Sequence, residues 1–137
     1  MAQAVLKGLT INLDWLELRL SNMLNKIDFI NAMYSLKESG QEFNTVFEHG
    51  TLSVEVYKPD RVDKQQPHER DEVYIIASGH GKFTLEHEET SIKAGDFLFV
   101  PAGANHRFIE FSGDFSTWVL FYGPQEGEKG TVRNHLS

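Results

Sequence analysis

Two histidines and one glutamate are the residues of this sequence best suited to chemistry. His68 and Glu72 lie together in the segment 66–79, and His106 closes a second segment, residues 95–106. Neutral imidazole and carboxylate are the ligand types that hold divalent iron, manganese, nickel or zinc, and this set leaves positions free for substrate or dioxygen. The sequence therefore predicts an open metal site.

No other catalytic group competes with this site. The chain has no cysteine, which excludes a disulfide framework, a thiol nucleophile and a zinc-thiolate site. Its serines lack the Gly-x-Ser-x-Gly context of a nucleophile elbow, and no glycine-rich phosphate loop precedes a helix. We therefore expect any chemistry to run through a metal held by nitrogen and oxygen ligands.

The spacing of His68 and Glu72 is compatible with two different backbones. On a helix, residues four apart are neighbours, and Pro67 suits a first helical position. Residues 73–76, however, form a short β-branched and aromatic run, which favours a strand. Four residues of a regular strand span ~13 Å, too far for one ion. We therefore expect the backbone to bend or bulge around residues 69–71 and to fold His68 back toward Glu72.

The two segments resemble the two motifs of the cupin superfamily, G-x5-H-x-H-x3,4-E-x6-G and G-x5-P-x-G-x2-H-x3-N. The matching spacings are His68-x3-Glu72-x6-Gly79 and Gly95-x5-Pro101-x-Gly103-x2-His106. The resemblance covers roughly residues 43 to 123 and implies that His68, Glu72 and His106 are metal ligands. It also implies a double-stranded β-helix, the jelly-roll barrel of cupins.

Two positions depart from the family pattern. Gln66 stands where the first motif usually has its leading histidine, and Glu110 replaces the asparagine that ends the second. The remaining His-Glu-His set is like that of cupins with a two-histidine, one-carboxylate iron site. The Gln66 amide oxygen is a further candidate ligand, or a hydrogen-bond partner of a bound ligand or water, and Gln65 replaces it if the bulge changes the register.

Hydrophobic patterning divides the chain into three parts. Residues 11–39 carry apolar side chains at helical spacing, so we expect residues 1–40 to form an α-helical extension packed on the barrel or on a partner. Asn12, Asp14 and Ser21 are candidate N-caps, and Gly40 is a stop. Residues 41–124 contain short runs bounded by turn residues, which predict an all-β jelly-roll barrel. Residues 125–137 form a polar C-terminal tail, expected to be mobile or wrapped on a neighbour.

The expected barrel strands follow the runs of β-forming residues, and the charged stretch 87–90 is interpreted as a turn. They cover residues 43–48, 52–57, 73–76, 82–86, 91–92, 97–100, 106–111 and 116–122.

Strand alternation suggests a substrate pocket beside the metal. Glu72 and Tyr74 share one face of their strand, and His106 and Phe108 share one face of theirs. If the two ligands point into the barrel, Tyr74 and Phe108 join the pocket wall, and Trp118 is the third candidate substrate-binding residue. Ordinary core packing is the alternative for all three aromatic residues.

The composition indicates which binding partners are disfavoured and in which cell compartment the protein is expected. The 137 residues include 13 Lys and Arg against 20 Asp and Glu, a net charge of -7, which disfavours nonspecific binding to nucleic acid or an anionic membrane. No apolar run approaches membrane-spanning length, and the first residues lack a signal-peptide core. We expect a soluble, cytoplasmic protein.

The functional hypothesis is a metal-binding cupin that acts as an iron-type oxygenase or dioxygenase on a small organic molecule, with Fe, Mn, Ni or Zn as the divalent metal ion. The alternative is a noncatalytic small-molecule or sugar-binding cupin whose metal is structural or absent. A homodimer is expected, because a small jelly roll leaves sheet edges that the N-terminal extension can cover.

Overall fold

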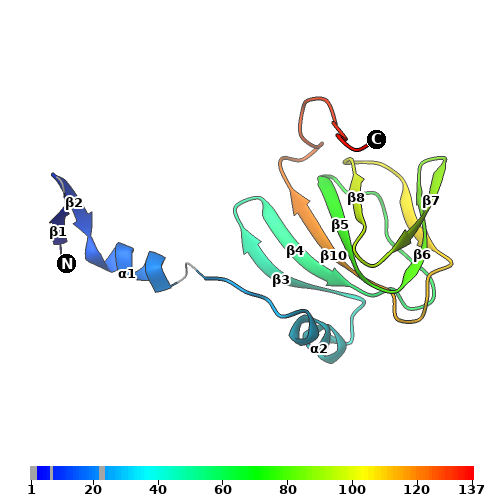
Figure 1. Ribbon diagram of the computed structural model, residues 1–137, viewed down its shortest axis with the longest axis horizontal. Helices are drawn as coiled ribbons and strands as arrows, with labels where there is room; N and C mark the ends of the chain where they lie inside the picture. The colour runs from blue at the N-terminus through cyan, green and yellow to red at the C-terminus, as the bar shows by residue number, and fades with distance from the viewer. Residues whose placement is uncertain (1–2, 7, 22–23) are drawn as a thin grey trace.

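The computed structural model describes residues 3–6, 8–21 and 24–137, and its centre is a barrel of two antiparallel sheets (Figure 1). One sheet has five strands in the order β3-β4-β10-β5-β8, and the other has three in the order β7-β6-β9. The predicted all-β jelly roll is therefore confirmed. The barrel strands are β3 (Phe43–His49), β4 (Leu52–Tyr57), β5 (Asp71–Ser78), β6 (His80–Leu85), β7 (Glu88–Lys93), β8 (Phe97–Val100), β9 (His106–Ile109) and β10 (Ser116–Tyr122).

The N-terminal part contains two helices and a hairpin. Strands β1 (Gln3–Leu6) and β2 (Leu9–Asn12) pair antiparallel, and they lead into α1 (Leu13–Ser21) and α2 (Phe29–Ser39). The two helices agree with the helical pattern, whereas the hairpin was not predicted. Its four-residue strands are too short to show a clear alternation.

The helix boundaries agree only partly with the predicted caps. The Asn12 side chain accepts a hydrogen bond from the Trp15 N–H at 3.2 Å, as an N-cap does. Ser21 is the last residue of α1, and the N-cap of α2 is Asp28, which accepts from the Asn31 N–H at 3.1 Å. Gly40 ends α2 at φ 69°, as predicted.

Aromatic and branched side chains fill the space between the two sheets. The Tyr74 and Phe108 rings lie 4.8 Å apart, and Phe108 lies 4.8 Å from Phe115. Those three rings are almost completely buried, with at most 1% exposed. The same cluster contains Tyr57, Ile76, Phe83, Ile92, Val100, Ala104 and Val119.

The outer face of the large sheet carries a second, smaller core against α2. Ala32 and Leu36 of the helix pack with Val56, and Trp118 joins them with its ring 5.9 Å from Phe29. Trp118 therefore lies on the side of β10 opposite the barrel interior, which corrects the expectation that it lines the pocket. A strand that is covered on both faces shows no alternation that would identify its inward side.

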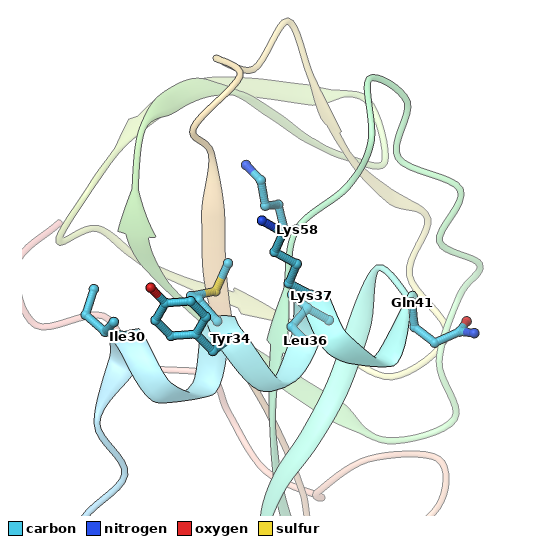
Figure 2. Close-up of a pocket in the computed structure, with 7 residues that line it drawn as sticks. Ile30, Tyr34, Leu36, Lys37, Gln41 and Lys58 are labelled. Carbon is cyan, nitrogen blue, oxygen red and sulfur yellow. The ribbon is translucent and has the colours of Figure 1, made fainter.

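Helix α2 also borders an open hollow of about 630 Å³ (Figure 2). Its lining includes Ile30, Met33 and Tyr34 of the helix, together with the lysines Lys37 and Lys58. We call this hollow the α2 groove. It lies outside the barrel, so it is separate from the space between the sheets.

The charged stretch after β6 is a strand and not the predicted turn. The turn is the dipeptide Glu86-His87, and β7 starts at Glu88, pairing with β6 over six residues. Most of β7 is exposed, and it stands at the edge of its sheet, where charged side chains disfavour pairing with another chain. The acidic residues of β7 therefore suggest a turn in the sequence, although in the structure they belong to an edge strand that they keep from pairing with another chain.

The start of the C-terminal tail is fixed to its own barrel, which corrects the expectation of a mobile or neighbour-bound tail there. The Glu126 N–H donates to the Glu69 carbonyl at 2.7 Å, and the Glu128 N–H donates to Asp71 Oδ2 at 2.8 Å. Asp71 is only 5% exposed, so it is not the solvated residue that its charged neighbours suggest.

Among the described residues, no helix is long and apolar enough to cross a bilayer.

Gly79, at the tight corner between β5 and β6, provides a stability test of the barrel. It has φ +77°, and a Cβ there would lie 2.7 Å from the Phe115 Cα. Gly79→Ala is expected to lower the free energy of unfolding by about 3 kcal/mol, because left-handed strain adds to overpacking. Gly50→Ala is the matched control, since φ is +57° but no atom lies within 4 Å, and it should cost only about 1 kcal/mol. Equal losses in urea denaturation would contradict the packing argument.

Candidate metal centre

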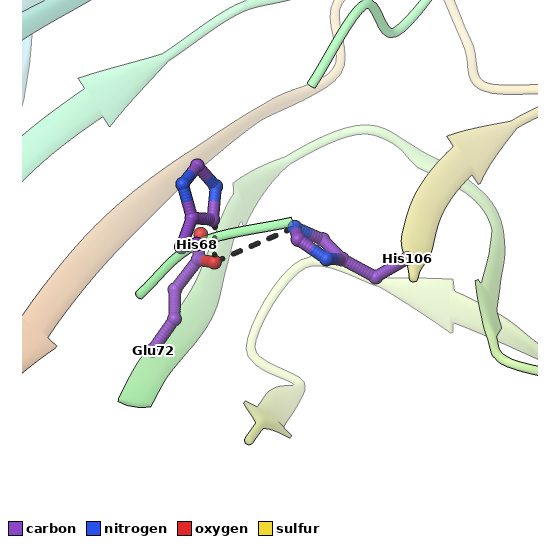
Figure 3. A group of neighbouring side chains, drawn as sticks. All are labelled: His68, Glu72 and His106. Carbon is purple, nitrogen blue, oxygen red and sulfur yellow. Dashed lines mark ion pairs between the residues drawn. The ribbon is translucent and has the colours of Figure 1, made fainter. Parts of the chain in front are cut away.

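His68, Glu72 and His106 converge between the two sheets (Figure 3). Each offers a ligand atom, and these atoms all lie within 4.8 Å of one another. The Nε2 atoms of His68 and His106 are each 3.4 Å from Glu72 Oε2. The side chains of Glu72 and His106 are 0% exposed, while that of His68 is 31% exposed. The three predicted ligands therefore form one compact group that opens to solvent beside His68.

The loop before β5 brings His68 to Glu72. His68 precedes the strand, residues 69 and 70 form a bend, and β5 begins at Asp71, so Glu72 is its second residue. The His68 carbonyl accepts a 2.7 Å hydrogen bond from the Gly103 N–H, which ties this loop to the turn before His106. The predicted bend is thus present, and it lies outside the strand.

The unmet hydrogen-bonding capacity of this group fits a bound cation. Nε2 of both histidines and both carboxylate oxygens of Glu72 are buried, and none has a hydrogen-bond partner among the described residues. Such atoms are rare in a folded interior because each costs desolvation free energy. His106 Nδ1 lies 2.9 Å from the Ala104 carbonyl, to which it donates, so Nε2 presents its lone pair to the centre. Two imidazoles and a carboxylate could hold iron, manganese, nickel or zinc.

The electrostatics of the group also indicate that a positive charge belongs there. Burial raises the pKa of Glu72 to about 8, and the negative charges of Glu55 and Asp63 raise it further. Burial, and then the neighbouring His106, lower the pKa of His68, which keeps that imidazole neutral as a ligand must be. A divalent cation would stabilise the ionised carboxylate that burial disfavours.

Aromatic rings lie beside both histidines of the group. The Tyr74 and Phe83 rings lie 6.1 and 6.3 Å from the His106 ring, and Phe121 meets the His68 ring edge-on at 4.9 Å. Of the predicted wall residues, Tyr74 is thus beside the group, whereas Phe108 packs behind it against Tyr74 in the core. Phe83 and Phe121 were missed, although alternation within their own strands could have suggested them.

The two glutamines before His68 have different surroundings. Gln65 accepts from the Tyr74 hydroxyl at 2.8 Å, and its Nε2 donates to Asp63 at 3.1 Å, so the protein itself occupies both ends of this amide. Gln66 is exposed and lines a shallow hollow of about 180 Å³ that also touches His106. Gln66 therefore remains the candidate for a fourth ligand or for a contact with a bound molecule.

Glu110 is excluded from the group by its position. It follows β9 with φ 48°, it is exposed, and its carboxylate lies 3.0 Å from the Lys82 ammonium. The position that carries asparagine in the family motif therefore serves a surface ion pair in this chain.

A buried aspartate that sequence reasoning overlooked holds the group together. Asp63 is 1% exposed and accepts hydrogen bonds from the Tyr57 hydroxyl at 2.7 Å, the Phe108 N–H at 2.8 Å, and the Gln65 N–H and Nε2 at 2.9 and 3.1 Å. Asp63 thus joins the loop leading to His68 with β9, the strand that begins at His106. A single aspartate in a polar connection carries no sequence signal for such a role.

Asp71 has a similar function on the opposite side of Glu72. Its Oδ1 accepts from the Ala102 N–H at 3.0 Å, in the turn that precedes His106, and its other oxygen holds the tail at Glu128. Two buried aspartates therefore fix the three segments that carry the candidate ligands.

Comparison with known proteins agrees with this architecture. The cupin domain family matches residues 53–120. An uncharacterised protein of Streptomyces coelicolor is 38% identical over 76 residues, which cover 54% of this chain and 72% of that protein. The chain belongs to the cupin superfamily. The matched region contains His68, Glu72 and His106, the three candidate metal ligands.

Solved cupins share the barrel at low sequence identity. A cupin-2 domain containing protein from Shewanella frigidimarina has a TM-score of 0.57 at 16% identity, covering 77% of this chain and 99% of that one. KdgF from Halomonas sp. has a TM-score of 0.53 at 23% identity, covering 61% and 79%. At these identities the similarity shows the fold alone.

The raised pKa of Glu72 predicts how the stability of metal-free protein depends on pH. The folded state keeps a proton on Glu72 up to about pH 8, whereas the unfolded state releases it near the ordinary glutamate pKa of 4.5, so stability falls as pH rises between these values. Between pH 4 and pH 8 the loss is on the order of 4 kcal/mol. Glu72→Gln should remove this loss while leaving the contribution of His68 unchanged. Urea denaturation of chelator-treated wild type and Glu72→Gln at several pH values measures this difference. If stability depends on pH in the same way in both proteins, Glu72 is not the group responsible.

Removing Asp63 should affect both stability and metal binding. Asp63→Ala leaves the buried Phe108 N–H and Tyr57 hydroxyl without their acceptor, so we expect a loss of about 3 to 4 kcal/mol in unfolding free energy. Tyr57→Phe removes one of these bonds and should cost only about 1 kcal/mol. If Asp63 positions the ligands, Asp63→Ala also weakens metal binding by roughly tenfold or more. Unchanged affinity in a folded variant, measured by titration calorimetry, would limit Asp63 to a structural role.

Proposed function

We propose that this cupin is a metal-dependent enzyme of the iron oxygenase or dioxygenase type that acts on a small organic molecule. The observation that carries the proposal is the convergence of four buried donor atoms, from His68, Glu72 and His106, that have no hydrogen-bond partner among the described residues. A bound iron ion would supply redox and Lewis-acid chemistry, with coordination positions left for substrate and dioxygen.

The charge of the ligand set favours a particular kind of substrate. Glu72 contributes one negative charge and the two histidines bind as neutral imidazoles, so a divalent cation leaves one net positive charge at the centre. A molecule that binds through an anionic oxygen would balance it. Enolates, catecholates and small carboxylates have this chemistry.

The surroundings of the open side of the group also favour an anionic substrate. His68 is the only exposed ligand of the three, so a substrate approaches from its side. The Arg70 guanidinium lies 6.0 Å from the centroid of the Phe121 ring, which itself meets His68 edge-on. Arg70 thus adds a positive charge near the entrance, while aromatic walls limit the access of water to the interior.

The metal assignment is tested with untagged protein loaded with iron, manganese, nickel or zinc. His68→Ala, Glu72→Gln and His106→Ala each remove one of three ligands, so each should lower metal affinity at least about a hundredfold. Loss of a residue that only hydrogen-bonds to a ligand usually has a smaller effect. His87→Ala, in the exposed turn after β6, is the control and should bind like wild type. Gln66→Ala should weaken or retune binding without abolishing it. Full occupancy at unchanged affinity in the three ligand variants would refute the site.

Turnover is tested separately, with dioxygen consumption by the iron-loaded protein. A panel of catechols, diketones and small carboxylic acids should reveal substrate-dependent uptake that Glu72→Gln lacks. The alternative function, a noncatalytic small-molecule or sugar-binding cupin, gives a different result. In that case the metal-loaded protein shows ligand-induced thermal stabilisation without consuming dioxygen.

A further inference from the structure

Exposed apolar side chains gather in the N-terminal part of the described chain. Eleven large apolar residues of the described chain are more than half exposed, and six of them fall between residues 5 and 34. They are Val5, Trp15, Leu18, Leu24, Ile30 and Tyr34. A concentration of this kind marks an interaction surface more often than scattered exposed residues do.

Four of these residues lie on the two helices, Trp15 and Leu18 on α1 and Ile30 and Tyr34 on α2. Ile30 and Tyr34 line the α2 groove, whose apolar floor is bordered by the ammonium groups of Lys37 and Lys58 (Figure 2). The Lys58 ammonium also donates to the Gly113 carbonyl at 2.7 Å, so it is held at the border of the groove. The groove therefore suits an apolar side chain that has a carboxylate beside it.

Helix α1 offers that combination. Trp15 and Leu18 are three residues apart, which places them on one face of the helix, and they are 54% and 64% exposed. Asp14 and Glu17, also three apart, stand next to them in the sequence. An apolar pair flanked by acids complements an apolar floor bordered by lysines in both polarity and charge.

We propose that α1 of one copy docks in the α2 groove of a second copy, and that the reciprocal contact makes a twofold dimer. In the structure α1 stands clear of the barrel and of α2 of its own chain (Figure 1). One twofold operation places both helices in both grooves, which closes the assembly. The contact lies on the outer face of the large sheet, away from the metal centre, so it neither requires nor disturbs metal binding.

The absence of cysteine makes cross-linking a direct test. Chains carrying only Leu18→Cys and only Tyr34→Cys are purified separately, mixed and mildly oxidised. A disulfide between Cys at 18 and Cys at 34 of different copies, identified by mass spectrometry, is the expected result. The control mixture replaces the second chain by His87→Cys, an exposed position in the turn after β6, and should give at least several-fold less product.

Two outcomes would overturn the proposal. If a chain with both cysteines closes on itself as a disulfide-linked monomer, α1 docks in the groove of its own chain. If no product exceeds the control and sedimentation shows only monomer at tens of micromolar, the groove does not bind α1 at all. Both results leave metal affinity unchanged, so they are distinguishable from a failure of the metal site.

A charge exchange provides a second test that does not depend on cysteine. Lys37→Glu places a carboxylate beside the acids of α1 and should raise the dimer dissociation constant roughly two- to fivefold, the scale of an exposed ion pair. Adding Glu17→Lys to the same chain should reverse the rise. Weakening by Lys37→Glu that Glu17→Lys does not relieve would contradict the charge match between α1 and the groove.

Discussion

A carboxylate buried without a counter-charge is the constraint on which this barrel depends. Glu72 lies at the second position of β5 with no exposed surface and no hydrogen bond to either oxygen among the described residues. Burial of an isolated charge is so unfavourable that a protein tolerates it only by protonation or by a paired cation. Two imidazoles face the same point, which makes a metal the natural partner.

The other buried carboxylates show how different a structural role looks. Asp63 accepts four hydrogen bonds and Asp71 accepts two, and the bonds from Phe108, Ala102 and Glu128 join segments that are distant in the sequence. Both aspartates are satisfied by the protein, whereas Glu72 is not. The contrast separates carboxylates that build the scaffold from the one that the scaffold presents to a ligand.

The two faces of the large sheet separate metal binding from the proposed assembly. Its inner face carries Glu72 and Tyr74 toward the opposing sheet, and its outer face packs Val56 and Trp118 against α2. Because successive side chains on a strand point to opposite faces, the same strands can serve both surfaces. A change at the α2 groove should therefore leave the ligand geometry intact.

The sequence by itself determined the fold class, most barrel strands, the helical character of α1 and α2, and the three residues that meet at the centre. Those features depend on local periodicity and on motif spacing, which are visible along the chain. Only the tertiary structure decided which face of β10 is inward, and therefore where Trp118 lies, because a strand covered on both sides lacks alternation. The role of Asp63 and the fixed start of the C-terminal tail were equally hidden, since each depends on backbone groups brought close only by the folded chain.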